Sequence, residues 1–176
     1  CVVHKFTDLQ IKDNIIDGLK LQEPDCYHDF RGYYWTNYNF KDDKLIFNHD
    51  KISVSKKNVL RGIHGDSVTT KMVTCAYGEV YCVVVDNRED SQTYKKWYWT
   101  MLNHNNRKVI CLPPGVGLGY LITSDEASIL YKWSYAGDYP DIDKQFTLKW
   151  DDKDLNIYWP VSNPILQPRD KYETSL

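Results

Sequence analysis

The sequence lacks long apolar runs, a dominant charge of either sign, and repeats or low-complexity stretches. Its apolar runs extend over only a few residues, such as 83–85, so no membrane-spanning helix is predicted. Lys and Arg number 22 against 24 Asp and Glu, a net charge of −2. This balance gives no electrostatic indication of nucleic-acid binding. We therefore expect neither a nucleic-acid partner nor a membrane partner.

Metal-binding and cofactor-binding motifs are also missing. The five cysteines are odd in number and form no CxxC pair, which argues against both a disulfide framework and a zinc site. The sequence contains no HxH, HExxH, P-loop or GxGxxG pattern. We expect no metal and no cofactor. The first ten residues include Lys5 and Asp8 and show no apolar core, so no signal peptide is predicted and a cytoplasmic location is expected.

The chain is instead rich in aromatic residues, with 14 Tyr, 6 Trp and 5 Phe among 176 residues. This length predicts a single domain over residues 1–176 with a core of its own. Short runs of β-branched and aromatic residues recur between turn-forming residues, which is typical of an all-β sandwich or barrel. The predicted strands are 44–47, 52–55, 59–64, 71–77, 79–86, 94–102, 108–112, 119–123, 128–135 and 145–150. Only 10–17 and 151–155 allow short helical turns.

Alternation along these strands predicts which side chains share a face. In 79–86 both alternating sets are apolar, so that strand should be covered on both sides. In 128–135, Tyr131 shares a face with Ile129 and Trp133. In 71–77, Lys71 shares a face with inward-facing apolar residues, which makes it a candidate for an interior polar site. The alternative, which the pattern alone favours, is that Lys71 begins the strand and reaches solvent.

His64 is the most informative histidine, because it follows Arg61 and Gly62 within one strand. Strict alternation would place Arg61 and His64 on opposite faces. A bulge at Gly62 would bring both side chains inward. On the pattern alone, a structural, hydrogen-bonded His64 is the more common situation.

Several longer motifs resemble those of the dTDP-4-dehydrorhamnose 3,5-epimerase family, metal-free cupins that act on nucleotide-linked 4-keto sugars. They stand in family order, from about residue 19 to 170: Asp29-Phe30-Arg31-Gly32-Tyr33-Tyr34, Val59-Leu60-Arg61-Gly62-Ile63-His64, Lys71-Met72-Val73-Thr74-Cys75, Gly78-Glu79-Val80, Val84-Val85-Asp86-Asn87-Arg88, Ser91-Gln92-Thr93-Tyr94, Pro113-Pro114-Gly115, Leu130-Tyr131-Lys132, Trp159-Pro160 and Arg169-Asp170. The resemblance implies a jelly-roll β-sandwich of the cupin type. The Arg-Gly-Ile-His-Gly-Asp variant most resembles a branch that epimerises GDP-linked 4-keto-heptoses for capsule polysaccharide.

The resemblance also implies roles for individual residues. His64 would be the base that removes a proton beside the ketone, oriented by the carboxylate of Asp170. Tyr131 would be the acid on the opposite face of the sugar. Lys71 would stabilise the enolate at the C4 oxygen. Without the resemblance, Asp170 would be interpreted as a solvated residue near the end of the chain and Tyr131 as a core aromatic.

Substrate binding is implied for four further residues. Arg31 and Arg61 match diphosphate-binding positions, where the guanidinium group forms paired, charge-assisted hydrogen bonds. Tyr34 and Tyr139 resemble the pair that holds the nucleotide base. Members of the family are homodimers that exchange N-terminal strands, so Arg31 and Tyr34 would serve the partner's site. The alternative for Arg31 is an ordinary surface turn residue.

The chain departs from the family pattern at several positions. Where the family motif Pro-x-Gly-x-Ala-His-Gly-Phe ends in Ala-His-Gly-Phe, this chain has Gly117-Leu118-Gly119-Tyr120, so Leu118 stands where a second active-site histidine would be. Trp35 and Thr36 replace a Glu that helps bind thymidine, and Lys51 replaces an Asn. The sequence predicts an epimerase acting at C3, C5 or both. The alternatives are a non-catalytic sugar-binding jelly roll and a single-centre GDP-heptose epimerase.

Overall fold

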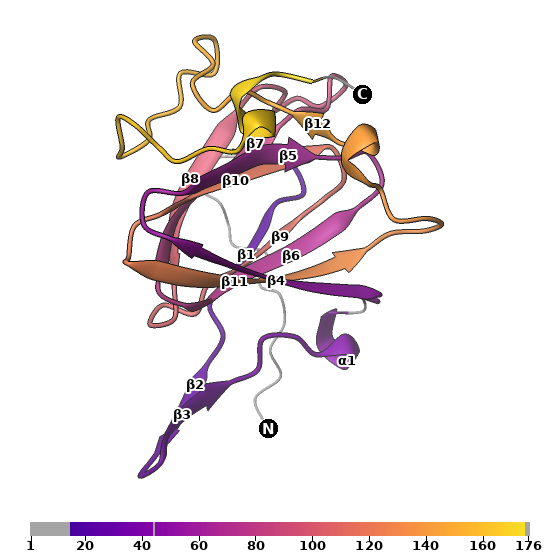
Figure 1. Ribbon diagram of the computed structural model, residues 1–176. Helices are drawn as coiled ribbons and strands as arrows, with labels where there is room; N and C mark the ends of the chain where they lie inside the picture. Colours follow the sequence, from indigo (N-terminus) through magenta and orange to yellow (C-terminus); the bar gives the residue numbers. More distant parts are fainter. Residues whose placement is uncertain (1–14, 44, 175–176) are drawn as a thin grey trace.

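The computed structural model describes residues 15–43 and 45–174 and consists of two five-stranded sheets packed face to face (Figure 1). The first sheet has the order β1 (Lys20–Gln22), β9 (Val109–Leu112), β6 (Thr70–Tyr77), β11 (Glu126–Ser134) and β4 (His49–Lys56). The second has the order β12 (Phe146–Thr147), β5 (Leu60–Gly65), β10 (Val116–Ile122), β7 (Glu79–Asp86) and β8 (Trp97–Asn103). Neighbouring strands within each sheet run antiparallel.

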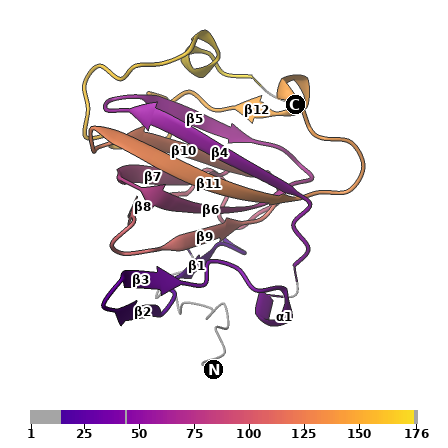
Figure 2. The ribbon, with the colours of Figure 1, turned by 60° about the horizontal axis from the view of Figure 1, so that its bottom comes forward.

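A separate hairpin of β2 (Cys26–Asp29) and β3 (Gly32–Trp35) projects from the sandwich. In both ribbon views it lies away from β12 and from the C-terminal segment, residues 148–174 (Figure 2). The short helix α1 (Phe40–Asp43) follows the hairpin. Two 3₁₀ turns complete the fold: η1 (Ile142–Lys144) precedes β12, and η2 (Pro168–Lys171) lies near the end of the chain. None of the helices in the described ranges is long and apolar enough to span a membrane.

Two apolar clusters hold the layers together. The first lies between the sheets, where alternate residues of β6, β7, β10 and β11 meet, among them Val73, Val80, Ile122 and Ile129. The second lies on the outer face of the second sheet, where Tyr81 and Val83 pack under Trp159 of the C-terminal segment. Strand β7 therefore has buried side chains on both faces, as its uninterrupted apolar sequence predicted.

The all-β prediction is confirmed, and most predicted strands lie within a residue or a few of the observed ones. Strand β7 has the predicted limits, whereas β8 begins at Trp97 instead of 94 and the predicted strand 145–150 shortens to Phe146–Thr147. Residues 45–47 form no strand, and position 44 lies outside the described residues.

The hairpin and the predicted helical turns were the weakest parts of the sequence interpretation. Strands β1, β2 and β3 were not predicted as strands. In the exposed hairpin, alternation carries no signal because most of its residues are exposed on both faces. Residues 151–155 form turns, and 15–17 form a bend and a turn, while 10–14 lie outside the described residues.

Candidate active site

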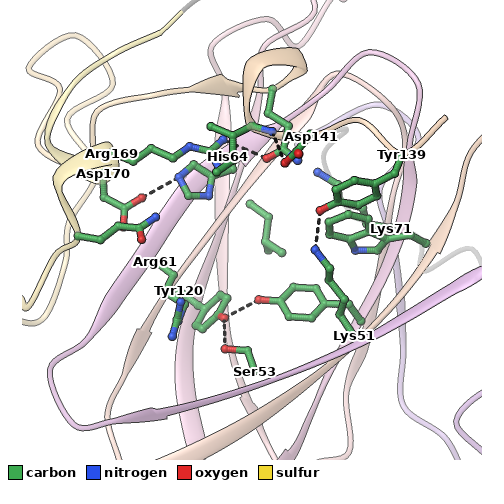
Figure 3. A pocket seen from close by; sticks show the side chains of 16 residues that line it. Lys51, Ser53, Arg61, His64, Lys71, Tyr120, Tyr139, Asp141, Arg169 and Asp170 are labelled. Atoms are coloured by element: carbon green, nitrogen blue, oxygen red, sulfur yellow. Dashed lines mark hydrogen bonds and ion pairs between the residues drawn. The ribbon is translucent and has the colours of Figure 1, made fainter.

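A cavity of about 380 Å³ opens at one end of the space between the two sheets (Figure 3). Both sheets contribute to it, together with the 3₁₀ turns and the loops beside them. Its lining residues are Lys51, Ser53, Arg61, His64, Lys71, Leu118, Tyr120, Tyr131, Trp133, Tyr139, Asp141, Ile142, Gln145, Gln167, Arg169 and Asp170. The four predicted catalytic residues and two of the four predicted binding residues are among them.

Strand β5 contains the bulge that was the condition for bringing Arg61 and His64 inward together. In the pairing with β10, His64 lies opposite Leu118 and Arg61 lies opposite Tyr120, so three steps along β5 match two along β10. Gly62 has a φ of +105°, and a Cβ there would lie 2.4 Å from the Leu118 carbonyl oxygen, so only glycine fits. The extra residue brings both Arg61 and His64 to the cavity.

His64 contacts the carboxylate of Asp170, which η2 carries into the protein. His64 Nε2 lies 2.7 Å from Asp170 Oδ1, with 2% of the Asp170 side chain exposed against 21% for His64. Burial lowers the pKa of His64 from its usual value; the hydrogen bond to Asp170 opposes this, and Arg169 and Lys71 add to it. The contact with Asp170 leaves Nδ1 as the ring nitrogen for proton exchange. The interpretation of Asp170 as a solvated terminal residue is wrong.

Lys71 is buried at the start of β6, so the alternative that the pattern alone favoured, in which it reaches solvent, is wrong. Its Nζ lies 3.2 Å from Asp66 Oδ2 and 5.4 Å from the centre of the Trp133 ring. Burial lowers the pKa of Lys71, and the Asp66 carboxylate opposes this. The backbone N–H groups of Val68 and Thr69 donate to Asp66 Oδ1 and fix the carboxylate in place. A fixed ammonium group is thus held in the cavity wall.

Tyr131 on β11 faces the cavity from the first sheet, opposite the sheet that carries His64. Its hydroxyl donates to the hydroxyl of Tyr120, at 2.5 Å, and Tyr120 donates to Ser53 Oγ at 3.2 Å. Burial raises the pKa of Tyr131 well above its usual value, and Tyr120 raises it further. Tyr131 therefore stays protonated over the physiological range, as a general acid must.

Aromatic rings and a lysine form one side of the cavity mouth. The rings of Trp133 and Tyr139 stack with centres 5.4 Å apart and 3° between their planes. Lys51 Nζ lies 4.6 Å from the centre of the Trp133 ring and 4.5 Å from that of Tyr139, and it donates to the Tyr139 hydroxyl at 2.5 Å. Tyr139 is thus placed at the cavity, with one ring face against Trp133.

Arg169 lines the opposite side of the cavity. Its Nη2 donates to Gln145 Oε1 at 3.0 Å and its Nε donates to Thr147 Oγ1 at 3.3 Å.

Arg61 donates through Nε to Ser55 Oγ at 2.9 Å. Within the described ranges, no carboxylate lies within ion-pair distance of Arg61 or Lys51. These two side chains are therefore cations available to an anionic ligand.

Arg31 and Tyr34 lie outside this cavity, on the projecting hairpin. Arg31 forms an ion pair with Asp29 at 2.5 Å, and the Tyr34 ring stacks on Tyr27 with centres 5.5 Å apart. Tyr34 is 62% exposed, and the same hairpin carries Phe30, which is 98% exposed. Among the residues that the structure describes, nothing brings these hairpin side chains to His64, so their role in a partner's site stays a prediction.

Sequence analysis missed several residues that the cavity brings together. Tyr120 and Ser53 each stand two positions from a residue that was singled out, namely Leu118 and Lys51, whereas Trp133 was placed on the face of Tyr131 but given no role. Strand alternation alone would have placed them on the same face. Asp66, Gln145 and Arg169 carry no such signal, because turns and irregular segments position them. In the described part of the chain, no three His, Cys, Asp or Glu side chains could together hold a metal ion.

The arrangement suits proton transfer on a bound ligand. A histidine paired with a carboxylate and a protonated tyrosine face one cavity from opposite sheets, with a buried ammonium group between Asp66 and Trp133. A base, an acid and a fixed positive charge are the groups needed to form and reprotonate an enolate.

The family model described as dTDP-4-dehydrorhamnose 3,5-epimerase matches residues 13–176. A relative of that name from Shigella flexneri is 37% identical over 169 residues, which covers 91% of each chain. The crystal structure of the Bacillus anthracis dTDP-4-dehydrorhamnose 3,5-epimerase with TDP and PPi bound aligns with a TM-score of 0.85 and 31% identity, over 94% of this chain and 98% of that one.

A Legionella pneumophila dTDP-6-deoxy-D-glucose-3,5-epimerase, solved in complex with dTDP-4-keto-L-rhamnose, aligns with a TM-score of 0.81 and 32% identity. That match covers 88% of this chain and 86% of the Legionella chain. Together with the all-strand architecture, these similarities confirm the predicted jelly-roll β-sandwich of the cupin type.

Proposed function

The chain belongs to the dTDP-4-dehydrorhamnose 3,5-epimerase family, and on this premise we propose that its cavity inverts C3, C5 or both of a nucleotide-linked 4-keto-6-deoxy sugar. It is an isomerase, and the single domain proposed over residues 1–176 carries the whole activity. The expected reaction moves only protons, so the proposal includes no metal and no cofactor.

Hydrogens on the carbons beside a ketone are acidic because the carbanion left behind is an enolate. We propose that His64 removes this proton, with Asp170 holding the imidazole in place. Negative charge then develops on the C4 oxygen, where the ammonium group of Lys71 stabilises it. Tyr131 returns a proton to the opposite face of the carbon, and the configuration is inverted.

The observation that carries this proposal is the placement of His64 and Tyr131 in two opposing sheets that face one cavity. Inversion needs a proton acceptor on one face of the carbon and a proton donor on the other, and two packed sheets present side chains from both sides. The buried Lys71–Asp66 pair supports the same proposal, because an interior ammonium group is costly to bury and needs a compensating role or partner. Non-catalytic sugar binding requires neither feature.

Recognition of the nucleotide is proposed for both the cavity and the hairpin. Arg61 offers a guanidinium group to the diphosphate, and Tyr139 offers a ring to the base at the cavity mouth. Arg31 and Tyr34 would complete the site of a second subunit in a homodimer with exchanged N-terminal strands. Their exposure on a projecting hairpin supports this arrangement.

The proposal leaves two parts of the substrate to be identified, the nucleotide and the sugar. The relatives above are named for dTDP-linked sugars, which makes a dTDP-linked substrate the first candidate. Trp35, Thr36 and Leu118 depart from the family pattern, so the single-centre GDP-heptose epimerase stays the second. With either substrate the product would enter polysaccharide or deoxysugar synthesis, such as capsule formation, from the cytoplasmic pool of activated sugars.

Deuterium incorporation tests the proposal directly. The enzyme is incubated in D₂O with dTDP-, GDP-, UDP- and CDP-linked 4-keto-6-deoxy sugars, and C3 and C5 are followed by NMR. We expect deuterium at one or both carbons with the dTDP- or GDP-linked substrate, together with the epimer. Binding of a nucleotide sugar without any exchange would support the non-catalytic jelly roll instead.

A further inference from the structure

Three hydroxyl groups form a continuous line of hydrogen bonds that leads away from the candidate acid. Tyr131 donates to Tyr120 at 2.5 Å, and Tyr120 donates to Ser53 at 3.2 Å (Figure 3). The three residues come from β11, β10 and β4, so the line crosses from one sheet to the other and back. Tyr120 is 3% exposed, and the two phenol rings lie with centres 6.3 Å apart.

The surroundings of Tyr120 favour a negative charge there more than at Tyr131. Burial raises the pKa of Tyr120, but the hydrogen bonds with Ser53 and Tyr131 and the cation of Arg61 oppose this. The pKa of Tyr131 is raised by burial and raised again by Tyr120, and only Arg61 opposes the change. Of the two phenols, Tyr120 is thus the one whose ionised form has more support.

We propose that Tyr120 is a positioning residue that resupplies Tyr131 with a proton during inversion, an inference that rests on the epimerase function proposed above. The Tyr131 O–H bond breaks as the new C–H bond of the sugar forms from the electron pair of the enolate. The Tyr120 hydroxyl, which donates to Ser53 before the step, then turns to the Tyr131 phenolate, and its O–H bond breaks as the Tyr131 O–H bond forms again. The negative charge lost by the enolate ends on Tyr120, beside Ser53 and Arg61, and water reprotonates that phenolate afterwards.

This relay solves a problem of desolvation at the acid. If Tyr131 acted alone, the step would leave a phenolate on a residue whose surroundings disfavour ionisation, and unpaired buried charge is costly. Moving the charge one residue further places it near a hydroxyl donor and a guanidinium group.

A merely structural pairing of two buried hydroxyls is the competing explanation. Tyr81 provides the comparison, because it is 4% exposed and its hydroxyl has no hydrogen-bond partner among the described residues. It lies in the second apolar cluster, against Trp99 and Trp159 and away from the cavity. The fold therefore accommodates a buried tyrosine without a partner, and Tyr81→Phe serves as the matched control for Tyr120→Phe.

The test separates two reactions of the same substrate in D₂O. His64 alone can exchange the substrate hydrogen with solvent, whereas inversion also needs the proton from Tyr131. For Tyr120→Phe we expect epimer formation to fall about tenfold, since a hydrogen bond to a charged group is lost, while exchange changes by less than about twofold. The ratio of exchange to inversion then rises, and Tyr81→Phe leaves it unchanged.

Ser53→Ala removes the hydroxyl group that stabilises the Tyr120 phenolate. It should therefore also raise the ratio of exchange to inversion, by a smaller factor of about threefold. It also decides the matter if Tyr120→Phe does not fold. An unchanged ratio in the folded variants, or equal losses of exchange and inversion, overturns the relay and leaves the epimerase proposal standing. Absence of exchange in the wild-type enzyme with every nucleotide sugar overturns both proposals.

Discussion

The two ends of the space between the sheets are built from the same strands but have opposite chemistry. On β6, Lys71 faces the cavity, whereas Val73 and Cys75 further along the same face belong to the apolar cluster. On β11, Tyr131 faces the cavity and Ile129, two residues away, packs in the apolar cluster. A single step of strand alternation therefore separates the candidate site from the core.

This contrast shows how the sandwich supports a polar cavity in its interior. Taking the Lys71–Asp66 pair out of water costs several kcal/mol per ion before their attraction offsets it. The apolar end carries no such charges: Cys75, Val80 and Ala127 are completely buried there. We infer that the apolar end provides the stability and the polar end the chemistry, so substitutions at the two ends should have separable effects.

The largest separable effect is expected from His64→Asn at the polar end. Loss of the base should lower both exchange and inversion at every carbon by about a thousandfold, because general-base catalysis contributes on the order of 10² to 10⁴. Deuterium incorporation measures this. The matched control is His104→Asn, since His104 stacks on Tyr77 at the other end of β6 and contacts Gly78. Equal losses in the two variants would contradict the division between the ends.

The sequence predicted the apolar end of the space between the sheets better than the polar end. Alternation identified the inward faces of β6, β7 and β11, because a half-buried strand must place every second residue in the core. The inward orientation of Arg61 and His64 was predictable only as a conditional statement, since it depends on a bulge at Gly62. The roles of His64, Asp170, Tyr131 and Lys71 came from the family resemblance and stay proposals.

What could not be predicted depends on contacts between distant segments. Asp66 follows β5 and meets Lys71 only because the turn before β6 folds back, and Arg169 reaches the cavity from η2. The stacking of Tyr139 on Trp133 joins a loop to a strand end. No periodicity marks such pairs, so strand alternation alone favoured solvent for Lys71, and only the family resemblance predicted its interior position.

Two neighbouring inward positions of β11 lie on either side of the boundary between the polar and the apolar end. Tyr131→Phe should slow inversion about 100-fold with a much smaller effect on exchange, since only the acid is lost. Ile129→Ala should instead lower the free energy of unfolding by about 3 kcal/mol and leave the turnover of the folded enzyme unchanged. Urea unfolding and epimer formation are measured on both variants. A large change in both quantities for both variants would mean that the two ends are not independent.

The smallest effect concerns the pH at which the polar end becomes active. Burial, with help from Arg169 and Lys71, lowers the pKa of His64, so its neutral, proton-accepting form persists below pH 6.5. The acid limb of kcat/KM should therefore lie below pH 6.5.

Asp170 works against this shift, so Asp170→Asn should move the acid limb to still lower pH. Asp125→Asn is the control, because Asp125 lies in the exposed turn before β11, at the apolar end. A limb that moves to higher pH in Asp170→Asn would show that Asp170 does not stabilise the imidazolium form. The protonation of His64 would then have to be set by groups other than those that face it here.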